Sequence, residues 1–281
     1  MPLKAILLDA DGVLWRGRSV IEPAPEFIRR ARAAGLSCLV VSNNAGPNRE
    51  AYSDKCARLG LDLGPHDIFS VNHLAGPYVA AHHPRAHAFV IGSEMLVRSM
   101  REHTEVTGAD EWLAARGAGG RAATPDDLQL LADIDFDLVM IGIDVNVNYI
   151  KLALACVLIQ RGAILLAANP DYSFPFAGGV ILPGNGSIVS LVAEVSGVEP
   201  HYLGKPSLHL LEQIERETGI ARAEMVMIGD RPETDYDFAR AAGIFTYMVE
   251  TGVTPKAELP EDSDDVMVLP TLSEVAEQLG I

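Results

Sequence analysis

The sequence predicts an α/β protein built on a doubly wound parallel sheet, into which a second α/β domain is inserted. Short apolar runs alternate with helix-like segments along most of the 281 residues, a pattern typical of a parallel sheet with helices on both faces. Runs at 3–8, 36–41 and 224–228 end in polar side chains. Because ligands bind beyond the carboxyl ends of such strands, at a switch point in strand order, we expect these polar residues to share one crevice.

The chain opens with a strand, a turn and a helix. The run Leu3–Leu8 is apolar apart from Lys4, as expected of a strand buried on both faces, and it stops at Asp9. Pro23 marks the start of the following helix and Gly35 its end, since proline favours the first helical turn and glycine the position after the last. The run 36–41 then predicts the next strand.

The middle of the chain repeats this alternation and has enough residues for a domain of its own. We therefore divide the chain into a core of residues 1–83 and 200–281 and an inserted α/β cap of residues 84–199. In the core, an acidic loop at 258–265 precedes a last helix at 273–279. The elements expected in the cap are strands at 86–91, 139–143 and 163–167, helices at 94–102 and 149–160, and a glycine-rich loop at 117–120.

The composition argues against two classes of partner. The formal net charge is −16, so nucleic acids and anionic membrane surfaces are expected to be repelled. The apolar stretch 152–168 is interrupted at 160–162 and is too short to span a bilayer. Few, widely spaced cysteines and an N-terminus without the pattern of a signal peptide favour a cytoplasmic protein.

The first apolar run leads into Asp9-Ala10-Asp11-Gly12. Two carboxylates at this spacing suit phosphoryl transfer, because Asp9 can attack phosphorus while Asp11 protonates the leaving oxygen and later deprotonates water. Gly12 allows the backbone to approach a phosphate closely. Aspartate and glycine are also common in turns, so this motif alone is compatible with either a site or a turn.

Further motifs lie at or beside the ends of apolar runs. Ser42 and Asn43 can bind phosphate oxygens, but they can also cap a helix. Lys205, between a glycine and a proline, can balance the charge of aspartates and phosphate. Asp230 ends the third run and Asp235 follows one helical turn later. Their oxygens suit Mg²⁺, although a turn residue and an exposed helix residue would also explain them.

Taken together, the order D-x-D-G-V, S-N-N, G-K-P and G-D-R-x-E-T-D resembles the haloacid dehalogenase (HAD) superfamily of phosphohydrolases. The segments Asn169-Pro170-Asp171 and 182–187 resemble its para-nitrophenylphosphatase-like branch, which carries a large type IIA α/β cap between the second and third motifs. The resemblance covers nearly the whole chain and is weakest at 104–135.

This resemblance implies a role for each motif residue. Asp9 would be the nucleophile and a metal ligand, and Asp11 the general acid/base, with its backbone carbonyl on Mg²⁺. Asp230 would be a further ligand, and Asp235 would support the metal-bound waters. Lys205 would neutralise charge between nucleophile and phosphate. The residues expected to hold the phosphoryl group are Gly12, Ser42, Asn43 and Lys205.

We therefore expect a Mg²⁺-dependent phosphatase that hydrolyses small phosphorylated metabolites through an aspartyl-phosphate. The substrate classes compatible with the sequence are sugar phosphates, nucleoside monophosphates, phosphoglycolate and pyridoxal phosphate. The candidates for substrate specificity are Trp15, Tyr172, Ser173 and Phe174, for which ordinary packing is an equal alternative. The same motifs fit a phosphotransferase, while a phosphorylatable signalling module and an inactive relative are the non-enzymatic alternatives. The resemblance also implies a homodimer through the cap.

Overall fold

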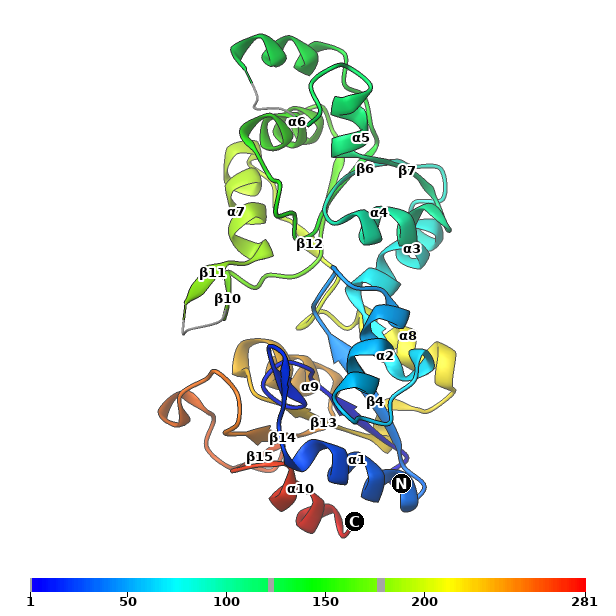
Figure 1. Ribbon diagram of the computed structural model, residues 1–281, viewed down its shortest axis with the longest axis vertical. Coiled ribbons are helices and arrows are strands. Elements are labelled where there is room, and N and C mark those ends of the chain that lie inside the picture. The colour runs from blue at the N-terminus through cyan, green and yellow to red at the C-terminus, as the bar shows by residue number, and fades with distance from the viewer. Residues whose placement is uncertain (1, 121–123, 176–179) are drawn as a thin grey trace. The chain divides into compact units, whose positions relative to one another are not determined.

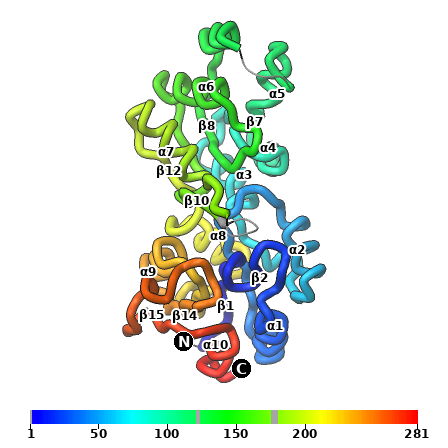
Figure 2. Tube along the Cα trace, turned by 60° about the vertical axis from the view of Figure 1, so that its left-hand side comes forward, coloured from blue at the N-terminus to red at the C-terminus, as the bar shows by residue number. Residues whose placement is uncertain are grey.

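The chain forms two compact α/β units in the computed structural model, which describes residues 2–120, 124–175 and 180–281 (Figure 1). Both chain ends lie in the first unit, near helices α1 and α10 (Figure 2). The first unit consists of Met1–Asn43, Arg49–Ser70 and Gly204–Ile281, and the second of Asn44–Asn48 and Val71–Leu203.

A six-stranded sheet forms the centre of the first unit, in the order β15-β14-β13-β1-β4-β5, and all its strand pairs are parallel. The central strand β1 is completely buried, as its apolar sequence predicts. Its alternate residues Ile6 and Leu8 pack in one hydrophobic cluster with Phe27 and Ile28 of α1. The strands are β1 (Ala5–Leu8), β4 (Ser37–Ser42), β5 (Ile68–Ser70), β13 (Met225–Gly229), β14 (Phe245–Val249) and β15 (Val266–Leu269).

Helices cover this sheet, and their ends carry the expected signals. Helix α1 begins at Pro23, and Gly35 follows it with a positive φ of 80°, which glycine adopts without steric cost. Helix α10 begins after Thr271, whose side chain accepts a hydrogen bond from the Ser273 N–H. A short hairpin, β2 (Trp15–Arg16) with β3 (Ser19–Val20), follows β1. The helices are α1 (Pro23–Ala33), α2 (Arg49–Arg58), α8 (His209–Thr218), α9 (Asp237–Ala242) and α10 (Leu272–Leu279).

The second unit contains its own parallel sheet, in the order β12-β9-β8-β6-β7, with a small antiparallel hairpin β10–β11. Strands β6, β8 and β9 and helices α4 and α6 confirm the elements predicted there. The strands are β6 (His87–Ile91), β7 (Glu105–Gly108), β8 (Leu138–Ile141), β9 (Ile164–Ala167), β10 (Ser173–Pro175), β11 (Ile181–Pro183) and β12 (His201–Tyr202). The helices are α3 (Val71–His82), α4 (Glu94–Arg101), α5 (Ala109–Ala114), α6 (Tyr149–Gln160) and α7 (Asn185–Ser196).

Along the chain, the main boundaries between the units fall at residues 70–71 and 203–204, with residues 44–48 also in the second unit. The boundaries expected from the sequence are 83–84 and 199–200. Helix α3 falls in the second unit because it packs against α4, and β12 falls there because it pairs with β9. Strand β7 was not anticipated, since an edge strand needs no continuous apolar run. Across the described part of the chain, no helix has the length and apolarity needed to cross a membrane.

Candidate active site

Neighbouring strands of the first unit bring the sequence motifs to one edge of the sheet. β13, β1 and β4 are adjacent and parallel, so the residues at their carboxyl ends, Asp230, Asp9 and Ser42, come to the same edge. The Asp9 N–H donates to the carbonyl of Ile228 over 2.9 Å. Because β4 lies on one side of β1 and β13 on the other, this edge is a topological switch point.

An acidic cluster lies at this edge, made of Asp9, Asp230 and Asp235, with carboxylate oxygens within 4.8 Å of one another. The ammonium of Lys205 lies 2.7 Å from Asp9 Oδ1 and 2.6 Å from Asp235 Oδ1. The side chain of Asp9 is 15% exposed, against 1% for Lys205 and Asp235. Asp9 is therefore the carboxylate of this set that a dissolved substrate can reach most easily.

Asp235 is committed to holding the cluster together. Its Oδ1 accepts from Lys205, and its Oδ2 accepts from the main-chain N–H groups of Asp230 at 3.0 Å and Arg231 at 3.1 Å. A side chain on Gly229 would place its Cβ 2.2 Å from the Cβ of Asp235. Glycine is therefore required at the end of β13 for Asp235 to approach the strand this closely.

Asp230 has the surroundings expected of a cation ligand. Its Oδ2 accepts from the Val253 N–H over 3.0 Å, while its buried Oδ1 has no hydrogen-bond partner among the residues that the structure describes. Buried polar atoms rarely lack a partner. Burial raises the pKa of Asp230 to about 7, and the charge of Asp235 adds to this effect. These oxygens therefore fit a hard divalent cation, which would offset the clustered negative charge.

Lys205 is held from both sides of its main chain. Its N–H donates to Asn43 Oδ1 over 2.6 Å, and Asn43 Nδ2 donates back to its carbonyl over 3.0 Å. The Lys205–Pro206 peptide bond is cis. Burial alone would lower the pKa of Lys205, but Asp235 and Asp9 outweigh it and raise the pKa above its ordinary value. The ammonium therefore stays charged, and Asn43 serves to position it, a role the sequence did not predict.

Helix α2 contributes residues that the sequence did not single out. The hydroxyls of Tyr52 and Ser42 lie 2.7 Å apart in a buried setting, and the Lys55 ammonium lies 4.0 Å from the ring centroid of Trp15. Trp15 is completely buried in the hydrophobic cluster that contains Tyr52. Trp15 is thus packed as its structural alternative expects, and its part in specificity stays a prediction. In a helix as polar as α2, no pattern pointed to Tyr52 or Lys55.

The loop after β1 carries Asp11 and Gly12. The Asp11 side chain is exposed, yet protein surrounds enough of it that desolvation raises its pKa, against the opposing charge of Lys55. Gly12 has a φ of 98°, and a Cβ on it would lie 2.5 Å from Asp230 Oδ2. Gly12 is thus required both by its backbone conformation and by the closeness of Asp230.

A loop after β14, residues 251–253, also contacts Gly12 and Asp230, although no motif in the sequence pointed to it.

The other specificity candidates lie in the second unit. Ser173 and Phe174 belong to β10, and Tyr172 precedes it with 66% of its surface exposed. The Tyr172 carbonyl accepts from the Gly184 N–H over 2.7 Å, and its hydroxyl accepts from Ser190 Oγ over 3.1 Å. Tyr172 is therefore fixed by hydrogen bonds at an exposed position, and its part in specificity stays a prediction.

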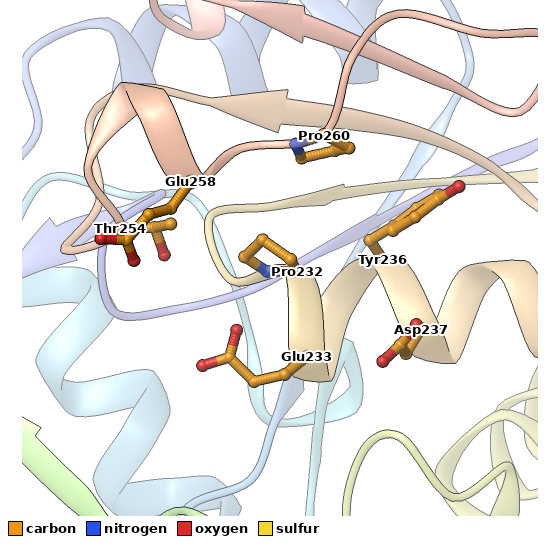
Figure 3. Close-up of a pocket in the computed structure, with 7 residues that line it drawn as sticks. All are labelled: Pro232, Glu233, Tyr236, Asp237, Thr254, Glu258 and Pro260. Carbon is orange, nitrogen blue, oxygen red and sulfur yellow. The ribbon is translucent and has the colours of Figure 1, made fainter.

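A hollow of about 370 Å³ lies next to the Asp235 turn, Pro232–Tyr236 (Figure 3). It is lined by Pro232, Glu233, Tyr236, Asp237, Thr254, Glu258 and Pro260. Three of these residues are acidic and none is basic, so the hollow disfavours a phosphate. Neither Asp9 nor Lys205 lines it, which separates it from the acidic cluster.

Comparison with known proteins gives consistent matches over nearly the whole chain. A family model described as haloacid dehalogenase-like hydrolase matches residues 6–104, and a HAD-hydrolase-like model matches residues 202–275. The acid sugar phosphatase of Staphylococcus aureus is 30% identical over 270 residues, covering 96% of this chain and 93% of its own. The 5′-nucleotidase YutF of Bacillus subtilis is 29% identical over 261 residues, covering 93% and 92%.

The fold matches solved structures as well. A double mutant of the thermostable NPPase from Geobacillus stearothermophilus superimposes with a TM-score of 0.78 at 28% identity, covering 95% of each chain. The motif order at one sheet edge, the two α/β units and these matches agree with one another. The chain therefore belongs to the haloacid dehalogenase-like hydrolases, as a phosphohydrolase of the para-nitrophenylphosphatase-like branch.

Proposed function

We propose that this chain hydrolyses small phosphate monoesters with Mg²⁺ through an aspartyl-phosphate on Asp9. The observation that carries the proposal is the pairing of Asp9 with Lys205, beside an Asp230 oxygen that has no hydrogen-bond partner in the described part of the chain. Transfer of a dianionic phosphoryl group needs a nucleophile, a positive charge and a metal ligand. Asp9, Lys205 and Asp230 Oδ1 supply these three groups. The names of the relatives, which include a sugar phosphatase and a nucleotidase, support the substrate class.

In the first half-reaction, Asp9 attacks phosphorus. Lys205 engages Oδ1, so attack is through Oδ2, and the bond from phosphorus to the leaving oxygen breaks as the new bond forms. Protonated Asp11 gives its proton to the leaving oxygen. Mg²⁺, when bound by Asp9, Asp230 and the Asp11 carbonyl, supplies neutralisation of the phosphoryl charge. The hydroxyl of Ser42 and main-chain N–H groups of the loop that carries Asp11 would orient the phosphoryl oxygens.

In the second half-reaction, water attacks the phosphorus of the aspartyl-phosphate. Asp11 takes a proton from the water as its oxygen attacks, and the bond between Asp9 and phosphorus breaks. Inorganic phosphate leaves, Asp9 is again a carboxylate, and Asp11 is again protonated. Lys205 keeps its charge throughout, because the Asp235 carboxylate holds its ammonium even while Asp9 carries the phosphoryl group.

Removal of divalent cations is expected to abolish hydrolysis of para-nitrophenyl phosphate, and Mg²⁺ is expected to restore it. Without a divalent cation, a dianionic substrate would be repelled by the clustered carboxylates of Asp9, Asp230 and Asp235, two of which contact the ammonium of Lys205. Nitrophenol release after exhaustive chelation, followed by titration with Mg²⁺, measures the effect. Full activity in the chelated enzyme would contradict the proposed mechanism.

A panel of phosphorylated metabolites is expected to show release of inorganic phosphate without any added acceptor. Sugar phosphates and nucleoside monophosphates, ranked by kcat/KM at saturating Mg²⁺, would identify the preferred class. Product formation that depends on an added acceptor alcohol would instead identify a phosphotransferase. The homodimer through the cap stays a prediction, which sedimentation of the full chain can test.

A further inference from the structure

A loop that the sequence motifs do not include reaches the acidic cluster from the far side of β13. Thr251, Gly252 and Val253 follow β14, which pairs with β13 in the sheet. Thr251 reaches Gly12 through its side chain, Val253 reaches Asp230 through its main-chain N–H, and Gly252 leaves room for the Asp230 carboxylate. We call them the 251–253 brace.

Thr251 acts on the loop that carries Asp11. Its hydroxyl donates to the Gly12 carbonyl over 2.7 Å, while the Gly12 N–H donates to the Trp15 carbonyl over 2.8 Å. Gly12 is therefore held on both sides. The peptide bond between Asp11 and Gly12 is planar and trans, so fixing its N–H also fixes the opposite direction for the Asp11 carbonyl. That carbonyl is one of the ligands proposed for Mg²⁺.

Gly252 and Val253 act on Asp230. The Val253 N–H donates to Asp230 Oδ2 over 3.0 Å, which leaves Oδ1 as the oxygen without a hydrogen-bond partner among residues 2–120, 124–175 and 180–281. A Cβ on Gly252 would lie 1.9 Å from Oδ2, and one on Gly12 would lie 2.5 Å from the same atom. The carboxylate is thus enclosed between two glycines. This arrangement determines which oxygen of Asp230 is presented to a cation.

Arg16 anchors the brace from the β2–β3 hairpin. Its guanidinium donates to the Thr251 carbonyl through both Nε, at 2.7 Å, and Nη2. Two donors on one carbonyl fix the direction of the peptide that follows Thr251. The anchor, the Asp11 loop and Asp230 therefore form one connected network around the brace, all within the first unit.

We propose that the 251–253 brace, anchored by Arg16, positions the Mg²⁺ ligands of this phosphatase. Thr251 holds the Gly12 carbonyl, in the peptide next to the one that contains the Asp11 carbonyl, and so restrains the Asp11 loop. Gly252 with the Val253 N–H selects the ligating oxygen of Asp230. The proposal rests on the Mg²⁺ site of the proposed function. Thr251 and Arg16 are positioning residues, because they act on the ligands and not on the substrate.

The test compares Thr251→Val, which removes the hydroxyl and keeps the shape, with Thr251→Ser, which keeps the hydroxyl. Calorimetric titration with Mg²⁺, without substrate, is expected to show affinity reduced about 10- to 100-fold in Thr251→Val and near wild type in Thr251→Ser. In assays, the activating Mg²⁺ concentration should rise by the same factor, while kcat at saturating Mg²⁺ recovers. Thr254→Val makes the same change three residues further along the loop and is expected to leave Mg²⁺ binding unchanged.

Thermal unfolding separates positioning from folding. Thr251→Val should unfold near the wild-type temperature without metal, and show a smaller rise in Tm when Mg²⁺ is added. If Thr251→Val does not fold, Arg16→Gln, which changes an exposed side chain, takes its place in the same titration. Wild-type Mg²⁺ affinity in the folded variant, or equal losses in Thr251→Val and Thr254→Val, would overturn the brace. Absence of Mg²⁺ binding to the wild-type enzyme would instead overturn the proposed function.

Discussion

The Asp9→Asn variant is expected to lose at least about 10⁴-fold in kcat for every phosphate monoester while remaining folded. The amide is nearly isosteric with the carboxylate, and its oxygen can still accept the hydrogen bond from Lys205. It cannot form the aspartyl-phosphate. Burial raises the pKa of Asp9 well above its ordinary value, with Lys205 opposing and Asp235 and Asp230 adding to it. The variant removes that unfavourable charge, so its free energy of unfolding should equal or exceed that of the wild type.

Steady-state kinetics with para-nitrophenyl phosphate and thermal unfolding of the same preparation measure both effects. Asp237→Asn is the matched control, because it makes the same chemical change on the exposed side of α9, where Asp237 pairs with Arg240. The control is expected to keep wild-type kcat. Residual activity of Asp9→Asn above about one percent would indicate direct attack by water on the substrate.

The Asp11→Asn variant is expected to affect substrates unequally, because Asp11 acts differently in each half-reaction. An alkyl phosphate needs a proton on its leaving oxygen, so formation of the aspartyl-phosphate should slow by about 10²–10⁴-fold. Para-nitrophenolate leaves well without a proton, so that step should slow little. Hydrolysis of the intermediate needs Asp11 as a base, whichever substrate formed it. The raised pKa of Asp11 favours the protonated form that the first step requires.

Rapid-quench kinetics distinguish these roles. With para-nitrophenyl phosphate, Asp11→Asn should give a burst of nitrophenol equal to the enzyme concentration, followed by slow turnover. Asp9→Asn, which cannot form the intermediate, should give no burst under the same conditions. Equal losses for both substrates and no burst in Asp11→Asn would show that Asp11 only places its carbonyl near the metal.

The sequence predicted the fold class and the meeting of Asp9, Ser42 and Asp230, because both follow from strand ends. Each strand is a short apolar run that stops at a polar residue, and a parallel sheet brings such ends to one edge. Lys205 was predicted from its neighbours Gly204 and Pro206 and from the order of the motifs. In the structure its ammonium contacts the carboxylates of Asp9 and Asp235.

The remaining parts of the site lack a signal of this kind. Thr251 acts through one hydroxyl on a carbonyl far away in the sequence, and Asn43 acts on the main chain of Lys205. Such contacts depend on the order of the strands in the sheet. A local pattern of residue types carries no information about that order. Gly252 was overlooked for a related reason. Its need for a small residue arises from the closeness of Asp230, and not from a turn with positive φ.

The division of the first unit along the chain has a consequence for synthesis on the ribosome. Strand β1 gains β4 on one side soon after it is made, but its other neighbour, β13, is translated only after the whole of residues 71–203. We expect that nearly continuous stretch to fold first, since domains generally fold as units as the nascent chain emerges. Until β13 arrives, the apolar β1 presents an open edge, which is a template for misassociation and a target for chaperones. The carboxyl ends of β1 and β13, which carry Asp9 and Asp230, are then among the last parts of the nascent chain to come together.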